Sequence, residues 1–144
     1  MARTITSANS IFILTVPGVF DSGVRIQDFA TDDAFDIDGV ANAEFRIGVD
    51  GNSAAGKVFA PKKMKVRLEA NSRSLAAFED WNRAEETLRD VIMASATITI
   101  PSIGKTYNLT DGAMTMFKPM PDVKKTLGAP EFEITWGRVE SANI

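Results

Sequence analysis

The acidic stretch from Asp28 to Gly39 (DFATDDAFDIDG) is the densest group of residues able to bind a metal or take part in acid–base chemistry. It holds five aspartates, and Asp21 precedes it as a sixth acid. An EF-hand loop needs acids at positions one, three and five, glycine at six and glutamate at twelve. With Gly39 at position six, apolar residues fall at positions one and twelve. The spacing argues against an EF-hand and leaves only an irregular oxygen site open.

A second candidate is GNSAAGKV, from Gly51 to Val58, which fits the G-x-x-x-x-G-K pattern of a phosphate-binding loop. That loop also needs a Ser or Thr hydroxyl for magnesium, at the position where Val58 stands, and it must open a helix. An alternating strand pattern follows instead. The small, glycine-flanked residues are typical of a flexible loop at the tip of a hairpin.

Enzyme chemistry finds little support elsewhere in the chain. There is no cysteine and no histidine, which removes thiol chemistry, zinc–thiolate sites and the commonest general base. A carboxylate pair for glycoside hydrolysis is not excluded, but Asp36 and Asp38 lie on one regular strand face, and no aromatic sugar platform accompanies them. We therefore expect no catalytic residue, no metal site, no cofactor and no enzymatic activity.

Length and charge favour one soluble domain that associates with itself. The 144 residues suit a single domain, and neither a secretory signal nor an apolar run long enough to span a membrane is visible. The expected location is therefore the cytoplasm. The net charge of −3 is uneven, because Lys57–Arg67 holds five bases and no acid. Separate acidic and basic patches favour self-complementary contacts over nucleic-acid binding.

Alternating apolar and polar residues are the main structural signal, and they predict a mainly β chain. In the segment 34–50, Phe35, Ile37, Phe45 and Ile47 alternate with polar residues. This predicts one continuous strand with its apolar side in the core, roughly 50 Å long at about 3.3 Å per residue. A strand that long is hard to bury in a small monomer, and its edges invite pairing with another chain.

Shorter alternating segments predict further strands at 11–16, 24–26, 63–70, 96–100 and 131–139. Asp111-Gly112 predicts a two-residue hairpin turn. The segment 72–90 spaces Leu75, Phe78 and Trp81 three apart, which predicts one amphipathic helix capped by Ser72 or Ser74. Residues 51–61 are predicted to form a loop, and Pro119 and Pro121 mark a second long loop. Both tryptophans are expected in the core or at an interface.

The order of these features resembles the tail tube proteins of contractile-tailed bacteriophages, whose fold is similar to the tubes of pyocins and of type VI secretion. The resemblance rests on RIGVDGNSAAGKV, KVRLEANSRSLAAFEDW, ATITIPSIGKTYNLTDGAM and EFEITWGRV, in this order across nearly the whole chain. It implies a single tail tube domain over 1–144, a β-sandwich or barrel with long hairpins and one flanking α-helix. The family has no active-site residue to carry over.

The resemblance also implies a function. Six copies would form a homohexameric ring, and stacked rings would make a hollow tube that guides the tape-measure protein and conducts DNA during ejection. A contractile sheath would surround this tube in the tail of a virion assembled in the host cytoplasm, and the subunit itself would bind no membrane. Two alternatives stay open: the tube of a DNA-free injector such as a tailocin or a type VI-like machine, and a monomeric β-barrel that binds a small ligand.

On this view the acidic strand face has a purpose, because a channel with negative lining gives DNA phosphates no site to bind. The residues expected to line the lumen are Asp36, Asp38, Asn42, Glu44 and Arg46. The residues expected between rings or subunits are Asn52, Ser53, Gly56, Lys57, Lys62 and Lys63. The competing interpretation is that the acidic patch pairs with the Lys57–Arg67 patch of a neighbouring subunit.

Overall fold

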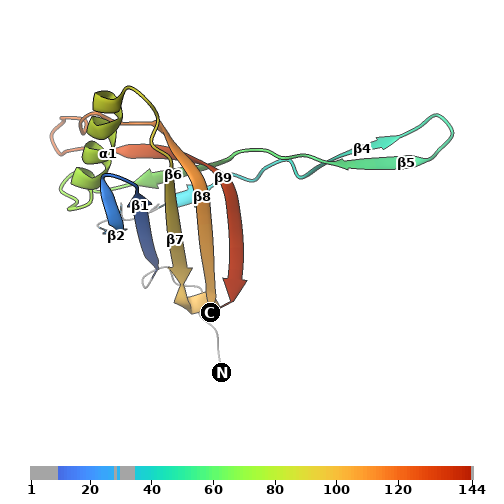
Figure 1. The fold of residues 1–144 in the computed structure, drawn as a ribbon, viewed down its shortest axis with the longest axis horizontal. Coiled ribbons are helices and arrows are strands. Elements are labelled where there is room, and N and C mark those ends of the chain that lie inside the picture. The colour runs from blue at the N-terminus through green and yellow to red at the C-terminus, as the bar shows by residue number, and fades with distance from the viewer. Residues whose placement is uncertain (1–9, 28, 30–34, 144) are drawn as a thin grey trace.

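The structure, a computed structural model, describes residues 10–27, 29 and 35–143. Its body is a seven-stranded antiparallel sheet in the order β2-β1-β7-β8-β9-β6-β3, and β4 and β5 form a separate hairpin (Figure 1). The strands are β1 Ile11–Val16, β2 Phe20–Ile26, β3 Phe35–Ile37, β4 Ala43–Ile47, β5 Ser53–Lys57, β6 Lys62–Arg67, β7 Ala94–Ile100, β8 Lys105–Met116 and β9 Glu131–Asn143. One α-helix, α1 Leu75–Leu88, and a 3₁₀ turn, Pro101–Ile103, complete the described elements. The predicted class, mainly β with one flanking helix, is confirmed.

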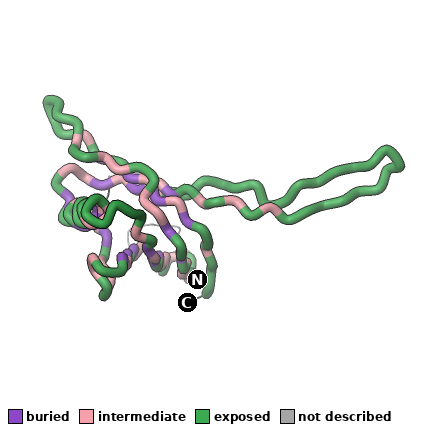
Figure 2. Tube along the Cα trace, turned by 45° about the horizontal axis from the view of Figure 1, so that its top comes forward, coloured by how far each residue is buried: buried purple, intermediate pink, exposed green. Residues whose placement is uncertain are grey.

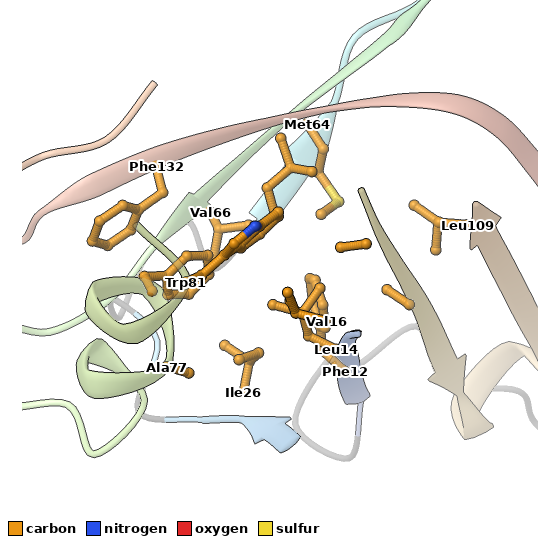
Figure 3. Packing of buried hydrophobic residues seen from close by; sticks show 14 of the residues in the cluster. Phe12, Leu14, Val16, Ile26, Met64, Val66, Ala77, Trp81, Leu109 and Phe132 are labelled. Atoms are coloured by element: carbon orange, nitrogen blue, oxygen red, sulfur yellow. The ribbon is translucent and has the colours of Figure 1, made fainter. Parts of the chain in front are cut away.

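The core forms because the alternating strands place one set of side chains on the inner face of the curled sheet. Eight of its members come from β1, β6 and β9, namely Phe12, Leu14, Val16, Met64, Val66, Phe132, Ile134 and Trp136 (Figure 3). Phe12 of β1 lies against Phe35 of β3 with ring centroids 5.4 Å apart. β1, the second strand of the sheet order, and β3, the last, therefore meet through their side chains across the interior.

Helix α1 covers one end of the sheet (Figure 1). Phe78 and Trp81 are fully buried, and the ring of Phe78 stacks on Phe132 of β9 with centroids 4.5 Å apart. The indole Nε1 of Trp81 donates a hydrogen bond to the carbonyl of Ile92, 3.1 Å away. The expectation that both tryptophans are buried is confirmed, since Trp136 is fully buried as well.

The serines before the helix do not cap it as predicted. Ser74 is the N-cap residue, but its side chain makes no capping hydrogen bond. Its hydroxyl instead accepts a hydrogen bond from the amide of Gln27 at 2.8 Å and lies 3.4 Å from the carbonyl of Arg25. The Ser72 hydroxyl donates to the carbonyl of Gln27 at 2.7 Å. The two buried serines thus attach the helix to the end of β2, where backbone groups need partners.

Asp111-Gly112 is not a hairpin turn, which corrects the sequence-based prediction. β8 continues through it, with Asp111 in the left-handed region at φ 56°. Leu109 pairs with Ala96 and Gly112 with Ala94, so β8 holds one more residue than β7 over this interval and forms a bulge. Gly112 lies against Trp136, where an added Cβ would come 2.3 Å from the indole ring. The glycine is needed for this close packing.

The predicted long strand over 34–50 is divided. β3 pairs with β6 in the body, whereas β4 belongs to the hairpin, and the residues between them are not in a strand. The predicted loop over 51–61 contains strand β5, because its residues pair with β4. The helix, at Leu75–Leu88, is shorter at both ends than the predicted 72–90. The predicted loop around Pro119 and Pro121 is confirmed, since no strand or helix lies between β8 and β9.

Candidate assembly interface

The hairpin of β4 and β5, residues 43–57, is here called the arm. Its two strands pair antiparallel from Ala43 opposite Lys57 to Ile47 opposite Ser53. The turn is closed by the amide of Gly48, which donates to the carbonyl of Asn52 at 2.7 Å. The Asp50 carboxylate accepts hydrogen bonds from the backbone and the side-chain amide of Asn52. Local hydrogen bonds therefore give the arm a defined shape.

The arm extends well away from the body, and all of its residues are exposed (Figure 2). One face carries Phe45 and Ile47, which are 65% and 69% exposed, and Ala55 lies opposite Phe45. The other face carries Glu44 and Arg46 beside Gly56 and Ala54. The prediction that this apolar face turns into the core of the same chain is wrong. Two large apolar side chains held in water favour a partner that covers them.

Short contacts fix the arm where it joins the body. The amide of Asp38 donates to the carbonyl of Lys63 at 3.0 Å, and the amide of Val58 donates to the carbonyl of Asn42 at 3.0 Å. The Lys57 ammonium also donates to the side-chain oxygen of Asn42. These hydrogen bonds therefore join the two sides of the arm to each other at its base, and they join the segment that follows β3 to β6.

The predicted lumen residues fall on two separate parts of the molecule. Asp36 lies in β3, where Oδ2 is 3.1 Å from Nη1 of Arg67 in β6. Arg67 also pairs with Glu131 of β9 through Nε at 3.1 Å. The hydrogen bond that Arg67 donates to the Asp36 carboxylate raises the pKa of the Arg67 guanidinium, against a smaller opposing effect of desolvation, and the negative charge of Glu131 adds to the rise. Asp36 is therefore part of an ion-pair row across three strands.

The other lumen candidates lie further out. Asp38 is exposed just after β3, and Asn42 accepts the hydrogen bond from Lys57 at the base of the arm. Glu44 and Arg46 share the polar face of β4 and make no ion pair within the described residues. The structure therefore does not gather the five residues into one cluster, and their place in a lumen stays a prediction.

The predicted interface residues divide in the same way. Asn52, Ser53, Gly56 and Lys57 lie on the arm, whereas Lys62 and Lys63 lie at the start of β6. Lys62 Nζ donates to the carbonyl of Gly137 at 3.4 Å, and Lys63 is exposed. The four arm residues are available to another chain, and whether they contact one stays a prediction.

An apolar cleft that the sequence analysis did not predict lies beside the C-terminal half of β9, residues 138–143. β6 covers β9 only as far as Trp136, and within the described residues nothing pairs with the same edge beyond it. A cavity of about 310 Å³ opens there between β3, β7, β8 and β9, lined among others by Phe35, Ile37, Ile98, Tyr107 and Val139. The apolar residues that line this cavity come from several strands, so no pattern within one segment could have predicted it.

A second apolar hollow lies at the end of the helix. Leu88, Val91 and Met93 border it together with the β1–β2 turn around Gly18 and Val19, and Leu88 is 66% exposed. This hollow is also large enough to hold a side chain from a partner.

The described structure does not support the metal site or the phosphate-binding loop that were considered from the sequence. Among the residues that the structure describes, no group of three or more acidic side chains lies together as metal ligands would. Asp28, Asp32 and Asp33 of the acidic stretch lie outside the described residues. GNSAAGKV forms the turn and second strand of the arm and leads into β6, not into a helix. No described helix is both long and apolar enough to cross a membrane.

The fold is similar to chains of several solved contractile machines. A chain of an extracellular contractile injection system, in the structure of the PVC sheath/tube terminator in its extended state, has a TM-score of 0.65 at 15% identity, covering 99% of both chains. A chain of the tube-terminating cap of the anti-feeding prophage gives 0.61 at 12% identity, covering 100% of this chain and 95% of that one. A chain of the six-fold symmetrised baseplate of the same prophage gives 0.59 at 10% identity, covering 99% and 98%.

At these identities the likeness concerns the fold, which is therefore the tail-tube-like fold of contractile systems. The chain belongs to the family described as tail fiber protein gp32, whose model matches residues 3–140. No curated protein matches the sequence.

Proposed function

We propose that this protein is a structural subunit of a phage tail tube, in which six copies form a ring and rings stack into a hollow tube. The observation that carries the proposal is the arm. It is ordered by its own hydrogen bonds, it extends away from the body, and it holds Phe45 and Ile47 in water. A monomer gains nothing from such an element, whereas an assembly buries it.

The fold comparisons support a tube position. The similar chains come from structures described as a sheath/tube terminator, a tube-terminating cap and a six-fold baseplate. These are parts of assemblies at or around a tube. The family description refers to a tail fiber. It therefore agrees with the proposal that the protein is a tail component, but it names a different part of the tail. The ring-forming tube is favoured because the similarity to the chain from the sheath/tube terminator structure covers 99% of both chains.

The proposed tube has partners outside and inside it, and it works in the tail. The sheath protein lies outside the tube, the tape-measure protein fills it before ejection, and DNA then passes through without specific binding. Asp38 and Glu44 are exposed acids without an ion-pair partner among the described residues, and on this proposal they face the lumen. The protein works in the virion tail after assembly in the host cytoplasm, and it acts as a structural element and not as an enzyme.

A second candidate is the tube of a contractile injector that carries no DNA. It is favoured by the similar chain from an extracellular contractile injection system. The two candidates differ in cargo and not in fold. Purified particles containing the protein separate them: a tail joined to a DNA-filled capsid supports the phage tube, and a capsid-free particle supports the injector.

Negative-stain electron microscopy of the purified protein tests the proposal. Six-fold rings or open-ended tubes are the expected result. The third hypothesis, a monomeric ligand-binding barrel, predicts single particles of one chain at every concentration, and that result would refute the tube.

A further inference from the structure

The cleft beside β9 exists because of where the chain leaves the sheet for the arm. β6 pairs with Glu131–Trp136 of β9, and its first residue, Lys62, stands opposite Trp136. The residues before Lys62 come from the arm, so the position next to 138–143 of β9 is vacant within the described structure. On its other side this part of β9 pairs with β8 as far as Asn143 opposite Lys105. A free strand edge with unpaired amides and carbonyls invites a further strand.

The interior side of this vacant position is apolar. Val139, Leu109 and Tyr107 face the cavity from β9 and β8, and Ile98 and Ile100 face it from β7. On the outer side, Arg138 and Glu140 of β9 form an ion pair with Nε and Oε1 3.3 Å apart. An added strand therefore needs apolar side chains on one face and charged side chains on the other.

Strand β4 of the arm has this pattern. It is five residues long, and the free edge of β9 at 138–143 spans six. Phe45 and Ile47 occupy one face, and Glu44 and Arg46 occupy the other. The arm extends away from its own body (Figure 1), so the strand available to fill the vacancy belongs to another copy.

We propose that β4 of one copy adds to the free edge of β9 in the next copy, with Phe45 and Ile47 seated in the cleft. This inference rests on the proposed self-assembly. The arm and the cleft are different surfaces of one molecule, so each copy donates an arm and receives one. Such head-to-tail contacts continue from copy to copy until a ring closes or a filament grows.

Charge sets the register. Placing Arg46 beside Glu140 pairs opposite charges on the outer face. In the parallel orientation Phe45 then lies beside Val139, and in the antiparallel orientation Ile47 does. Both orientations therefore direct an apolar side chain of the arm into the cleft and share one predicted neighbour pair, Arg46 and Glu140.

The test uses disulfide trapping, which has no background from native thiols because the chain contains no cysteine, and each variant oxidised alone gives the background of like-with-like dimers. Two single variants, R46C and E140C, are purified separately, mixed under assembly conditions and oxidised. Residues paired across neighbouring strands have Cα atoms about 4.5–5.5 Å apart, within reach of a disulfide. A mixture of R46C with L88C, at the hollow beside the helix, serves as the matched control.

We expect a covalent dimer in the R46C and E140C mixture and none in the control, while microscopy of the same samples shows assembled rings or tubes. Rings without the dimer would overturn the inference and leave the proposed function standing. A dimer in the L88C mixture would assign the arm to the hollow instead. Absence of any assembly by both variants and by the unmodified protein would refute the inference and the proposed function together.

Discussion

Asp36 and Arg67 form an ion pair across β3 and β6, with Oδ2 and Nη1 3.1 Å apart. The acidic and basic segments of the sequence therefore meet inside one subunit, at the strand that leads into the arm. Arg67 reaches Glu131 on its other side. Asp36 is thus less suited than Asp38 to line a channel freely, because its charge is already compensated.

This relationship changes how the lumen hypothesis is tested. Lysine at position 36 would stand beside Arg67 and opposite Lys65, and would loosen β3. We therefore predict the outcome for D38K/E44K, which leaves Asp36 in place. Tubes should form, because neither side chain is buried, and genome delivery should fall, because each lysine adds a phosphate contact. Infection assays and microscopy of the tails measure both effects, with D38N/E44Q as the control that removes charge without reversing it. Loss of tubes in the lysine variant alone would place these acids at a subunit interface.

Gly112→Ala should destabilise the fold by about 1–3 kcal/mol, as expected for overpacking. The new methyl group would come 2.3 Å from the ring of Trp136, which is fully buried and has no room to move. Gly39→Ala is the matched control, since no atom lies within 4 Å of its added Cβ. Urea denaturation measures both variants. Equal midpoints would mean that the bulge does not depend on this glycine.

Ser74→Ala should lower the free energy of unfolding by about 1–2 kcal/mol, because it leaves a partly buried amide without its acceptor. The amide is that of Gln27, 2.8 Å from the serine hydroxyl. Ser22→Ala, at an exposed position of β2, should change stability little. A loss in Ser74→Ala no larger than in this control would contradict the role given to the serine in holding the helix to β2.

Glu85 supplies a prediction about pH. Burial raises the pKa of its carboxyl, and the hydrogen bond from the amide of Ile92, at 3.3 Å, lowers it by less. A carboxyl whose folded pKa is raised favours folding below its unfolded pKa, and this contribution is lost as the pH rises through the folded pKa. E85Q keeps a hydrogen-bond acceptor without the charge. The melting temperature of E85Q relative to that of the unmodified protein should therefore rise as the pH is raised from 4 to 7. A constant difference across this range would show that the Glu85 charge carries no penalty.

The sequence predicted the fold well where one face of a strand is buried by the chain itself. In β6 and β9, alternation alone identified Met64, Val66, Phe132 and Ile134 as core residues, and all four are buried. Apolar spacing likewise located the helix, although its serines bond to β2 and not to the first turn. These predictions are correct because the spacing of the apolar residues matches the face that the same subunit buries.

Prediction was wrong where the partner of a residue lies far along the chain or where a segment leaves the body. The same alternation in β4 indicated a core face, yet Phe45 and Ile47 are exposed because the arm leaves the body. Asp111-Gly112 has the composition of a turn, but packing of Gly112 against Trp136 from a distant strand makes it a bulge. The cleft beside 138–143 depends on where β6 ends, which no local pattern contains.

The central claim is that the apolar face of the arm drives self-assembly, and sedimentation velocity at high micromolar concentration tests it most directly. Burying Phe45 and Ile47 is worth about 1.5–3 kcal/mol for each side chain. The unmodified protein should sediment as rings of six 15.6 kDa chains or as larger polymers, and F45S/I47S should sediment as a folded monomer with unchanged circular dichroism. The control V123S/L127S, which replaces two exposed apolar side chains in the loop between β8 and β9, should still assemble. A monomeric unmodified protein, or full assembly by F45S/I47S, would contradict the claim.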